Sequence, residues 1–137
     1  MDNPVNELKM WLVVRKDLRT IDDKPIPKGK LAGQSGHAFE RLTARIFRTG
    51  GKLLETYEQY ERDNTPKIIV TCKNLAALER AERECEAAGI ATYKVTDAGR
   101  TVFPEPTTTV LALGPYLRND LPKFVKDLQL MKEEADD

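Results

Sequence analysis

MWLVV, at residues 10–14, is an unbroken apolar run with the length of a typical β-strand. Such a run predicts a strand that is buried on both faces, as in an α/β sheet. Residues 68–70 and 109–113 are apolar in the same way, and residues 90–95 form a further expected strand, with Tyr93 and Val95 on one face. Gly-Pro at 114–115 is expected to end the strand at 109–113.

Helical segments separate the expected strands. The first covers residues 28–49, beginning after Pro27 and ending at the glycine pair 50–51. A shorter amphipathic segment at residues 53–60 follows it. This gives the chain two consecutive helical segments between its first two strands.

Later in the chain, Asn74 is a good N-cap for a helix over residues 75–88. A last helix is expected after Asn119 or Asp120, and its inward face would carry Leu121, Phe124, Val125 and Leu128. The order of elements is therefore β-α-(α)-β-α-β-β-α. It predicts an α/β fold with a small four-stranded mixed β-sheet flanked by helices on both faces.

The composition is that of an ordinary globular domain. The chain has 137 residues and a formal net charge of zero, so a nucleic-acid site would have to be a local basic patch. We expect residues 1–137 to form one domain, with residues 132–137 as a short acidic tail. No apolar run approaches the roughly 20 residues of a membrane span, and the N-terminus lacks signal-peptide features, so a cytoplasmic location is expected. Cys72 and Cys85 are expected to be reduced core thiols.

Polar side chains recur at helical spacing within residues 28–49. They are Lys30, Gln34, His37, Arg41, Arg45 and Arg48, which form one stripe. The opposite face is expected to pack on a sheet through Leu31, Ser35, Ala38, Leu42 and Ile46. An amine and an amide followed by guanidinium groups would suit an enzyme acting on a phosphate polymer. The alternative is a solvated helix face without function.

Common active-site signatures are missing. The sequence has no glycine-rich phosphate loop, no CxxC or HExxH motif, and no GxSxG motif. Ser35 and His37 would point roughly 200° apart on a helix, which argues against a serine hydrolase.

A second candidate site is the loop DAGRT at residues 97–101. Asp97 and Thr101 could share or relay a proton, or orient a water. Arg100 could hold a phosphate through two hydrogen bonds. The alternative is a plain turn in which Asp97 only caps backbone amides.

Three motifs follow one another along the chain. They are VVRKDL at 13–18, KGKLAGQSGHA at 28–38, and DAGRT at 97–101 followed by TVL at 109–111 and GP at 114–115. Together they resemble the type 2 peptidyl-tRNA hydrolases, the archaeal and eukaryotic form, whose motifs read KGKxAxQxxHA and DAGRT…TVLxxGP. The resemblance covers about residues 9–131.

This resemblance implies a single α/β domain that hydrolyses the ester between a peptide and the terminal ribose of tRNA, without a metal or other cofactor. The residues implicated in the family match Lys30, Asp97 and Thr101 as catalytic, with Thr109 in support. Gln34 and His37 match the helix motif, and His37 is either a participant or a structural group. The implied partner is peptidyl-tRNA, and the implied assembly is a homodimer, as is common in the family.

A mechanism follows as a hypothesis. Asp97 would accept a proton from an attacking water, directly or through Thr101, which requires a desolvated carboxyl. Lys30 would stabilise the oxyanion or hold the terminal phosphate. Thr109 and Gln34 would orient the water or the carbonyl. Arg100, Lys28 and Arg41 would bind backbone phosphate.

Two features depart from the family pattern. The loop at residues 19–27 is several residues longer than usual and is expected beside the active site. Gly33 and Gly36 replace residues that are more often alanine, cysteine or serine, and they are expected to permit close approach of the sheet or the substrate.

Two other functions are compatible with the sequence. One is a non-catalytic module that binds tRNA or a protein on the same fold. The other is a hydrolase of a related aminoacyl-tRNA ester. Intact Lys30, Asp97 and Thr101 favour retained catalysis over the binding module.

Overall fold

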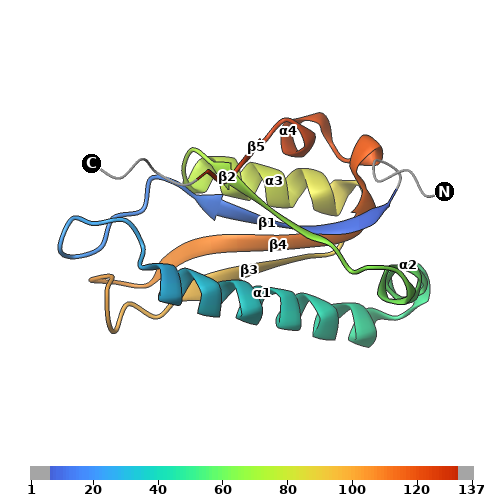
Figure 1. Cartoon of the computed structure of the whole chain (residues 1–137), viewed down its shortest axis with the longest axis horizontal. Coiled ribbons are helices and arrows are strands. Elements are labelled where there is room, and N and C mark those ends of the chain that lie inside the picture. The colour runs from blue at the N-terminus through green and yellow to red at the C-terminus, as the bar shows by residue number, and fades with distance from the viewer. Residues whose placement is uncertain (1–6, 133–137) are drawn as a thin grey trace.

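A mixed β-sheet runs through the centre of the molecule, shown in Figure 1 as a computed structural model that describes residues 7–132. Within these residues the five strands are β1 (Leu8–Arg15), β2 (Lys67–Cys72), β3 (Thr92–Asp97), β4 (Thr107–Leu117) and β5 (Gln129–Leu130). The helices are α1 (Lys28–Thr49), α2 (Gly51–Arg62), α3 (Leu75–Ala87) and α4 (Lys123–Lys126). The strands lie in the order β3-β4-β1-β2-β5.

Strand β1 lies in the middle of the sheet, as its apolar run predicts. Its residues 10–14 are at most 4% exposed. It pairs in parallel with β2 and antiparallel with β4, while β3 pairs antiparallel with β4 and forms one edge. Parallel neighbours need a crossover connection, which α1 and α2 supply.

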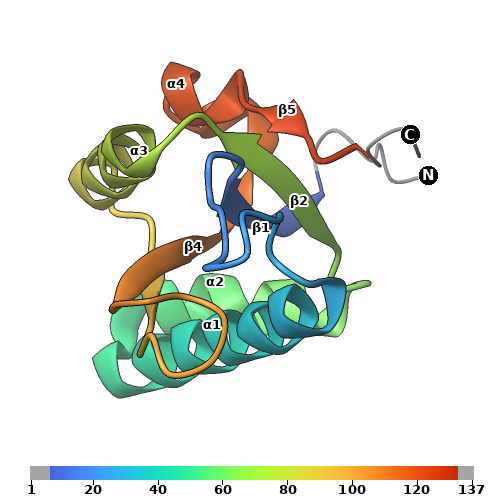
Figure 2. The ribbon, with the colours of Figure 1, turned by 90° about the vertical axis from the view of Figure 1, so that its left-hand side faces the viewer.

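Helices cover both faces of the sheet, which confirms the predicted layering. Figure 2 shows α1 and α2 against one face and α3 and α4 against the other. Successive residues of β1 point to opposite faces. Leu12 therefore packs in the core cluster that holds Leu42 of α1, while Val13 packs in the cluster that holds Leu78 of α3. Both faces being covered explains why the whole run is apolar.

The sheet is larger than predicted, with five strands rather than four among residues 7–132. The additional strand, β5, is two residues long and pairs with Val70 and Thr71 of β2. Strand β4 was expected to end at Gly114, but it continues to Leu117. The irregular register between Lys9 and Trp11 of β1 accommodates the Gly-Pro pair, because proline cannot donate a ladder hydrogen bond.

The end of the chain also differs from the prediction. Residues Arg118–Asp120 form a 3-10 turn, and Pro122, rather than Asn119 or Asp120, precedes the short helix α4. Leu121 and Val125 are buried as predicted, and Phe124 and Leu128 are partly buried against the same cluster. The inward face was predicted correctly, but the helix was expected too early and too long.

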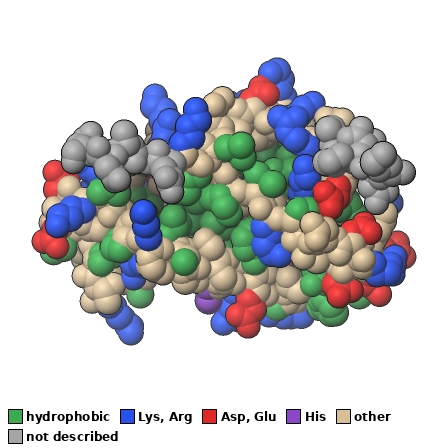
Figure 3. Space-filling view, viewed as in Figure 1, with side chains coloured by type: hydrophobic (Ala, Val, Ile, Leu, Met, Phe, Trp, Pro, Cys, Tyr) green, Lys and Arg blue, Asp and Glu red, His purple; other side chains and the backbone are tan. Residues whose placement is uncertain are grey.

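The surface in Figure 3 carries charges of both signs around its rim, with hydrophobic side chains gathered in its middle. Among residues 7–132, no helix has the length and apolarity needed to cross a membrane. Cys72 and Cys85 are buried free thiols, and burial raises their pKa values to about 11 and about 12. The acidic tail expected at 132–137 falls, except for Lys132, outside the described residues, as does the start of the N-terminus.

Candidate active site

The polar stripe of α1 lies beside the buried face of the helix rather than opposite to it. Ala38, Leu42 and Ile46 are buried against the sheet. Lys30 and Leu31 are adjacent, and adjacent helical residues point about 100° apart, so the two rows flank each other. The polar row therefore reaches β3, the edge strand, through contacts of Gln34, His37 and Arg45 with residues of that strand. This explains how side chains that looked solvent-facing reach the sheet.

Asp97 lies at the centre of a hydrogen-bonded group. It is the last residue of β3, which extends two residues beyond its predicted end. Its Oδ2 atom accepts from Gln34 Nε2 at 2.7 Å and pairs with Lys30 Nζ at 2.9 Å. Its Oδ1 atom accepts from the backbone N–H of Gly99 at 2.9 Å. Both carboxylate oxygens are therefore occupied, and the side chain is only 8% exposed.

Lys30 joins Asp97 to the end of the loop at 97–101. Its Nζ atom donates to Thr101 Oγ1 at 2.9 Å, and its side chain is 24% exposed. An ammonium group has three donors. Two of them are engaged by Asp97 and Thr101, which leaves one N–H of Lys30 without a partner among the described residues. The three predicted catalytic residues are thus brought together.

Thr109 completes the group from β4. Its hydroxyl donates to Gln34 Oε1 at 2.6 Å, and the residue is fully buried. Along β3 and β4, Val95 pairs with Val110 and Thr96 with Thr108, so Thr109 is an extra residue in a β-bulge. A bulge of this kind can re-aim a side chain. It turns Thr109 toward the α1 side, on which Val110 also lies.

The electrostatics of Asp97 differ from the hypothesis of a desolvated base. Burial acts to raise its pKa, but hydrogen bonds from Lys30 and Gly99, the Lys30 charge and the Gln34 amide outweigh burial. The pKa of Asp97 is therefore held below its ordinary value. The carboxylate is ionised and firmly paired, so its capacity to accept a proton is weaker than the hypothesis requires.

The remaining predicted residues lie outside this group. His37 is exposed and makes an edge contact with the Tyr93 ring, at 6.2 Å between centroids. Ser35 donates to the Leu31 carbonyl of its own helix, in agreement with the rejection of a serine hydrolase. The expected phosphate-binding residues, all exposed, are Lys28, Arg41 and Arg100.

Arg45 and Arg15 make contacts that the sequence did not predict. Arg45 lies 5.0 Å from the centre of the Tyr93 ring and donates to the Thr92 carbonyl at 2.6 Å, which ties α1 to β3. Arg15, at the end of β1, donates to the Thr108 carbonyl beside the bulge. A charged residue directly after an apolar run is the signal that could have singled out Arg15.

Gly99 is a further residue whose role the sequence left unstated. Its φ of +75° is in the region that favours glycine. A Cβ atom there would lie 2.3 Å from the Glu105 carbonyl carbon. The Gly99 N–H that binds Asp97 is therefore held in place by a turn that only glycine fits.

The two departures from the family pattern have different outcomes. The loop at 19–27 does lie beside the site: the Ile21 N–H donates to the Val102 carbonyl at 2.8 Å, one residue beyond Thr101. Figure 2 shows both loops at the same end of the molecule. At Gly33 and Gly36, by contrast, an added Cβ would meet nothing within 4 Å. The expected close approach of the sheet to these glycines is wrong.

The donor set of the group points to charge stabilisation and proton handling. Among residues 7–132, no cluster of three or more His, Cys, Asp or Glu side chains is placed to hold a metal ion. A cation, a carboxylate, an amide and two hydroxyls instead converge beyond the carboxyl end of β3. Such donors can polarise a carbonyl and orient a water.

Comparison with known proteins gives a consistent result. A family model described as "Peptidyl-tRNA hydrolase PTH2" matches residues 8–131. The "Peptidyl-tRNA hydrolase" of Methanothermobacter thermautotrophicus is 32% identical over 128 residues, which cover 90% of this chain and 100% of that protein. The "Probable peptidyl-tRNA hydrolase 2" of Drosophila melanogaster is 34% identical over 130 residues, covering 92% of this chain and 63% of that protein.

A third relative is the "Peptidyl-tRNA hydrolase 2, mitochondrial" of Bos taurus, 32% identical over 124 residues. The alignment covers 90% of this chain and 64% of the bovine protein. The chain thus spans the full archaeal relative but less than two thirds of the fly and bovine ones.

Proposed function

The chain belongs to the peptidyl-tRNA hydrolase family whose model it matches, and we propose that it hydrolyses the ester between peptide and tRNA at the group centred on Asp97. The observation that carries this assignment of the site is the continuous set of contacts from Thr109 through Gln34 and Asp97 to Lys30 and Thr101. These side chains come from α1, β3, the following loop and β4.

The proposed chemistry relies mainly on charge stabilisation. An ester is already activated, so positioning and stabilisation of the oxyanion supply much of the rate. Lys30 has a donor available for the oxyanion, and Asp97 keeps the ammonium oriented. The nucleophile is a water held by Thr101, whose hydroxyl accepts from Lys30 and can donate to a further group. The proton released by the attacking water passes through the Thr101 hydroxyl to the leaving ribose oxygen, while Asp97 stays ionised and paired with Lys30.

The tRNA part of the substrate is assigned to the exposed cations around the site. Lys28 lies at the start of α1 and Arg41 between three and four turns further along, while Arg100 lies in the loop next to Thr101. They would contact backbone phosphates and the acceptor end without reading base sequence. We place the peptide near the loop at 19–27, because that loop is hydrogen-bonded to Val102.

The assembled group favours catalysis over a purely binding function. A module that only bound tRNA would have no need for a buried Thr109 hydroxyl aligned with Gln34 and Asp97. Residues 1–137 would act as one hydrolase domain in the cytoplasm, and a homodimer remains a prediction from the family. Some relatives carry "mitochondrial" in their names, which makes location a separate test.

The test is release of peptide from N-blocked aminoacyl-tRNA by the purified chain, with and without EDTA. Turnover is expected in both conditions. Lys30→Ala and Asp97→Ala should each lower kcat/KM by about 100-fold, or about 2.7 kcal/mol of barrier. Lys94 and Glu82 provide a matched control. They form a similar ion pair, with 3.1 Å between Nζ and Oε1, and they lie outside the Asp97 group. Lys94→Ala should keep its activity, and no turnover by a folded wild type would contradict the proposal.

A further inference from the structure

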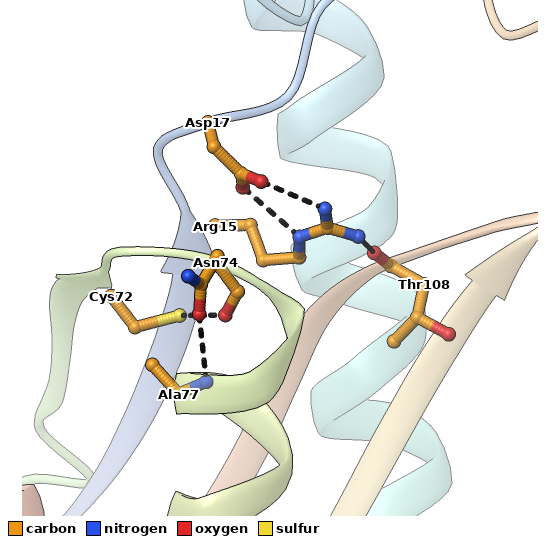
Figure 4. Close-up of polar contacts among 6 residues, drawn as sticks. All are labelled: Arg15, Asp17, Cys72, Asn74, Ala77 and Thr108. Atoms are coloured by element: carbon orange, nitrogen blue, oxygen red, sulfur yellow. Dashed lines mark hydrogen bonds and ion pairs between the residues drawn. The ribbon is translucent and has the colours of Figure 1, made fainter.

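Arg15 is the last residue of β1, and each of the three nitrogens of its guanidinium donates a hydrogen bond (Figure 4). Nε and one terminal nitrogen donate to the two carboxylate oxygens of Asp17 at 3.1 and 2.9 Å. The other terminal nitrogen donates to the Thr108 carbonyl at 2.9 Å. The Arg15 side chain is 14% exposed and that of Asp17 is 37% exposed. Planar two-point pairing of this kind fixes the guanidinium in one orientation.

The contact falls where regular pairing of β4 stops. The ladder between β1 and β4 ends at the pair of Val14 and Val110. Beyond it, β4 bulges at Thr109 and then pairs only with β3, through Thr108 and Thr107. The Arg15 side chain supplies a donor to Thr108 at the position where β1 no longer offers a backbone group. It thereby holds the residue that immediately precedes Thr109.

We propose that Arg15 and Asp17 are positioning residues for the hydrolysis: they hold the bulge of β4 in the conformation that aims Thr109 at Gln34, and through Gln34 they orient Asp97. The proposal rests on the proposed function for its kinetic consequence. Three of the five N–H donors of Arg15 are taken by Asp17 and the Thr108 carbonyl, and its side chain is only 14% exposed. We therefore assign it a role through Thr109 rather than a contact with the substrate.

The experiment compares Arg15→Lys with Arg118→Lys in hydrolysis of N-blocked aminoacyl-tRNA. Arg118 is a matched control, since it also donates to a backbone carbonyl. Its partner is the Lys126 carbonyl at 3.3 Å, and both residues lie away from the site. Lysine keeps the charge at position 15 but cannot pair with Asp17 and Thr108 simultaneously in this geometry. We expect kcat to fall about tenfold with KM within about twofold, and Arg118→Lys to match the wild type.

The same substitution in a Thr109→Val background separates positioning from other roles. If Arg15 acts through Thr109, then Arg15→Lys should change kcat by less than about twofold once the hydroxyl is absent. A full tenfold loss in that background would overturn the proposal, and so would a rise in KM at unchanged kcat. Asp17→Asn is the second variant if Arg15→Lys does not fold, and it should show the same dependence on Thr109.

A readout without turnover makes the proposal independent of the proposed function. The side-chain amide of Gln34 donates to Asp97, so its NMR signals should differ from those of a free amide. We expect Arg15→Lys to move these signals toward free-amide values and Arg118→Lys to leave them unchanged. Unmoved signals in Arg15→Lys would overturn the inference even if the enzyme is active. A wild-type protein that does not hydrolyse the substrate would contradict only the proposed function.

Discussion

Thr109 is the residue on which the orientation of the whole group depends. It is buried, and its hydroxyl is the donor that fixes which end of the Gln34 amide faces Asp97. Thr109→Val keeps the shape but leaves Gln34 Oε1 without this partner, which costs about 1–3 kcal/mol when an acceptor is buried. Activity should fall and thermal stability should decrease, whereas Thr109→Ser should restore most of both. Equal activity in the valine and serine variants would argue against the role of the hydroxyl.

The lowered pKa of Asp97 makes a prediction about pH. A carboxyl whose folded pKa is below its unfolded value stabilises the fold above the unfolded value, and this contribution disappears as pH falls through the folded value. The ordinary pKa is 3.8. The difference in unfolding free energy between the wild type and Asp97→Asn should therefore be constant from pH 7 to about pH 5 and shrink below about pH 4. Urea titrations at several pH values measure it, and a difference that shrinks already near pH 6 would contradict the assignment.

Two glycines of helix α1, Gly33 and Gly36, have backbone roles that differ from that of Gly99 in the loop at 97–101. Gly33 and Gly36 lie in the helix interior with open space around the missing Cβ atoms. Alanine at each should stabilise the protein by about 1 kcal/mol, because glycine is a poor helix former. Gly99→Ala should destabilise it instead, since its φ is +75° and the new Cβ would meet the Glu105 carbonyl. Thermal unfolding distinguishes the two kinds of position.

At the level of elements, local patterns predicted what local chemistry determines. The limits of α1 follow from Pro27 and the glycine at position 50, and the start of α3 follows from Asn74, whose side chain accepts from the Ala77 N–H (Figure 4). Strand β5 could not be predicted from its own two exposed residues. They form a strand because β2 leaves an open edge with which they can pair. The bulge at Thr109 depends likewise on its partner strands.

The candidate site shows the same division between local and non-local information. Lys30, Asp97 and Thr101 could be identified from their motifs, and the structure brings them within hydrogen-bonding distance. The ionised state of Asp97 could not be identified, because burial and pairing act on its pKa in opposite directions. Which effect is larger is settled only by the distances to Lys30, Gln34 and Gly99.

Considered as a whole molecule, the protein has no net charge with which to attract tRNA. Affinity should therefore depend on a few local cations and decrease steeply with salt. Three phosphate contacts predict that log KM rises with log salt with a slope of about 2 to 3. Replacing the exposed cations Lys28, Arg41 and Arg100 by glutamine should flatten this slope with little change in kcat. Arg83→Gln on α3, across the sheet, is the control, and an equal effect there would contradict a local site.

The contacts of the Asp97 group have a consequence for how activity is acquired. They join residues 63, 71 and 75 positions apart in the chain. Closing such long loops comes late when a chain collapses, whereas a helix of 22 residues such as α1 can form within about a microsecond. During refolding, ellipticity should recover before hydrolysis does. The recovery of hydrolysis therefore reports the last folding step. A nascent chain that has not yet emerged beyond Thr109 is inactive toward the tRNA to which it is itself attached.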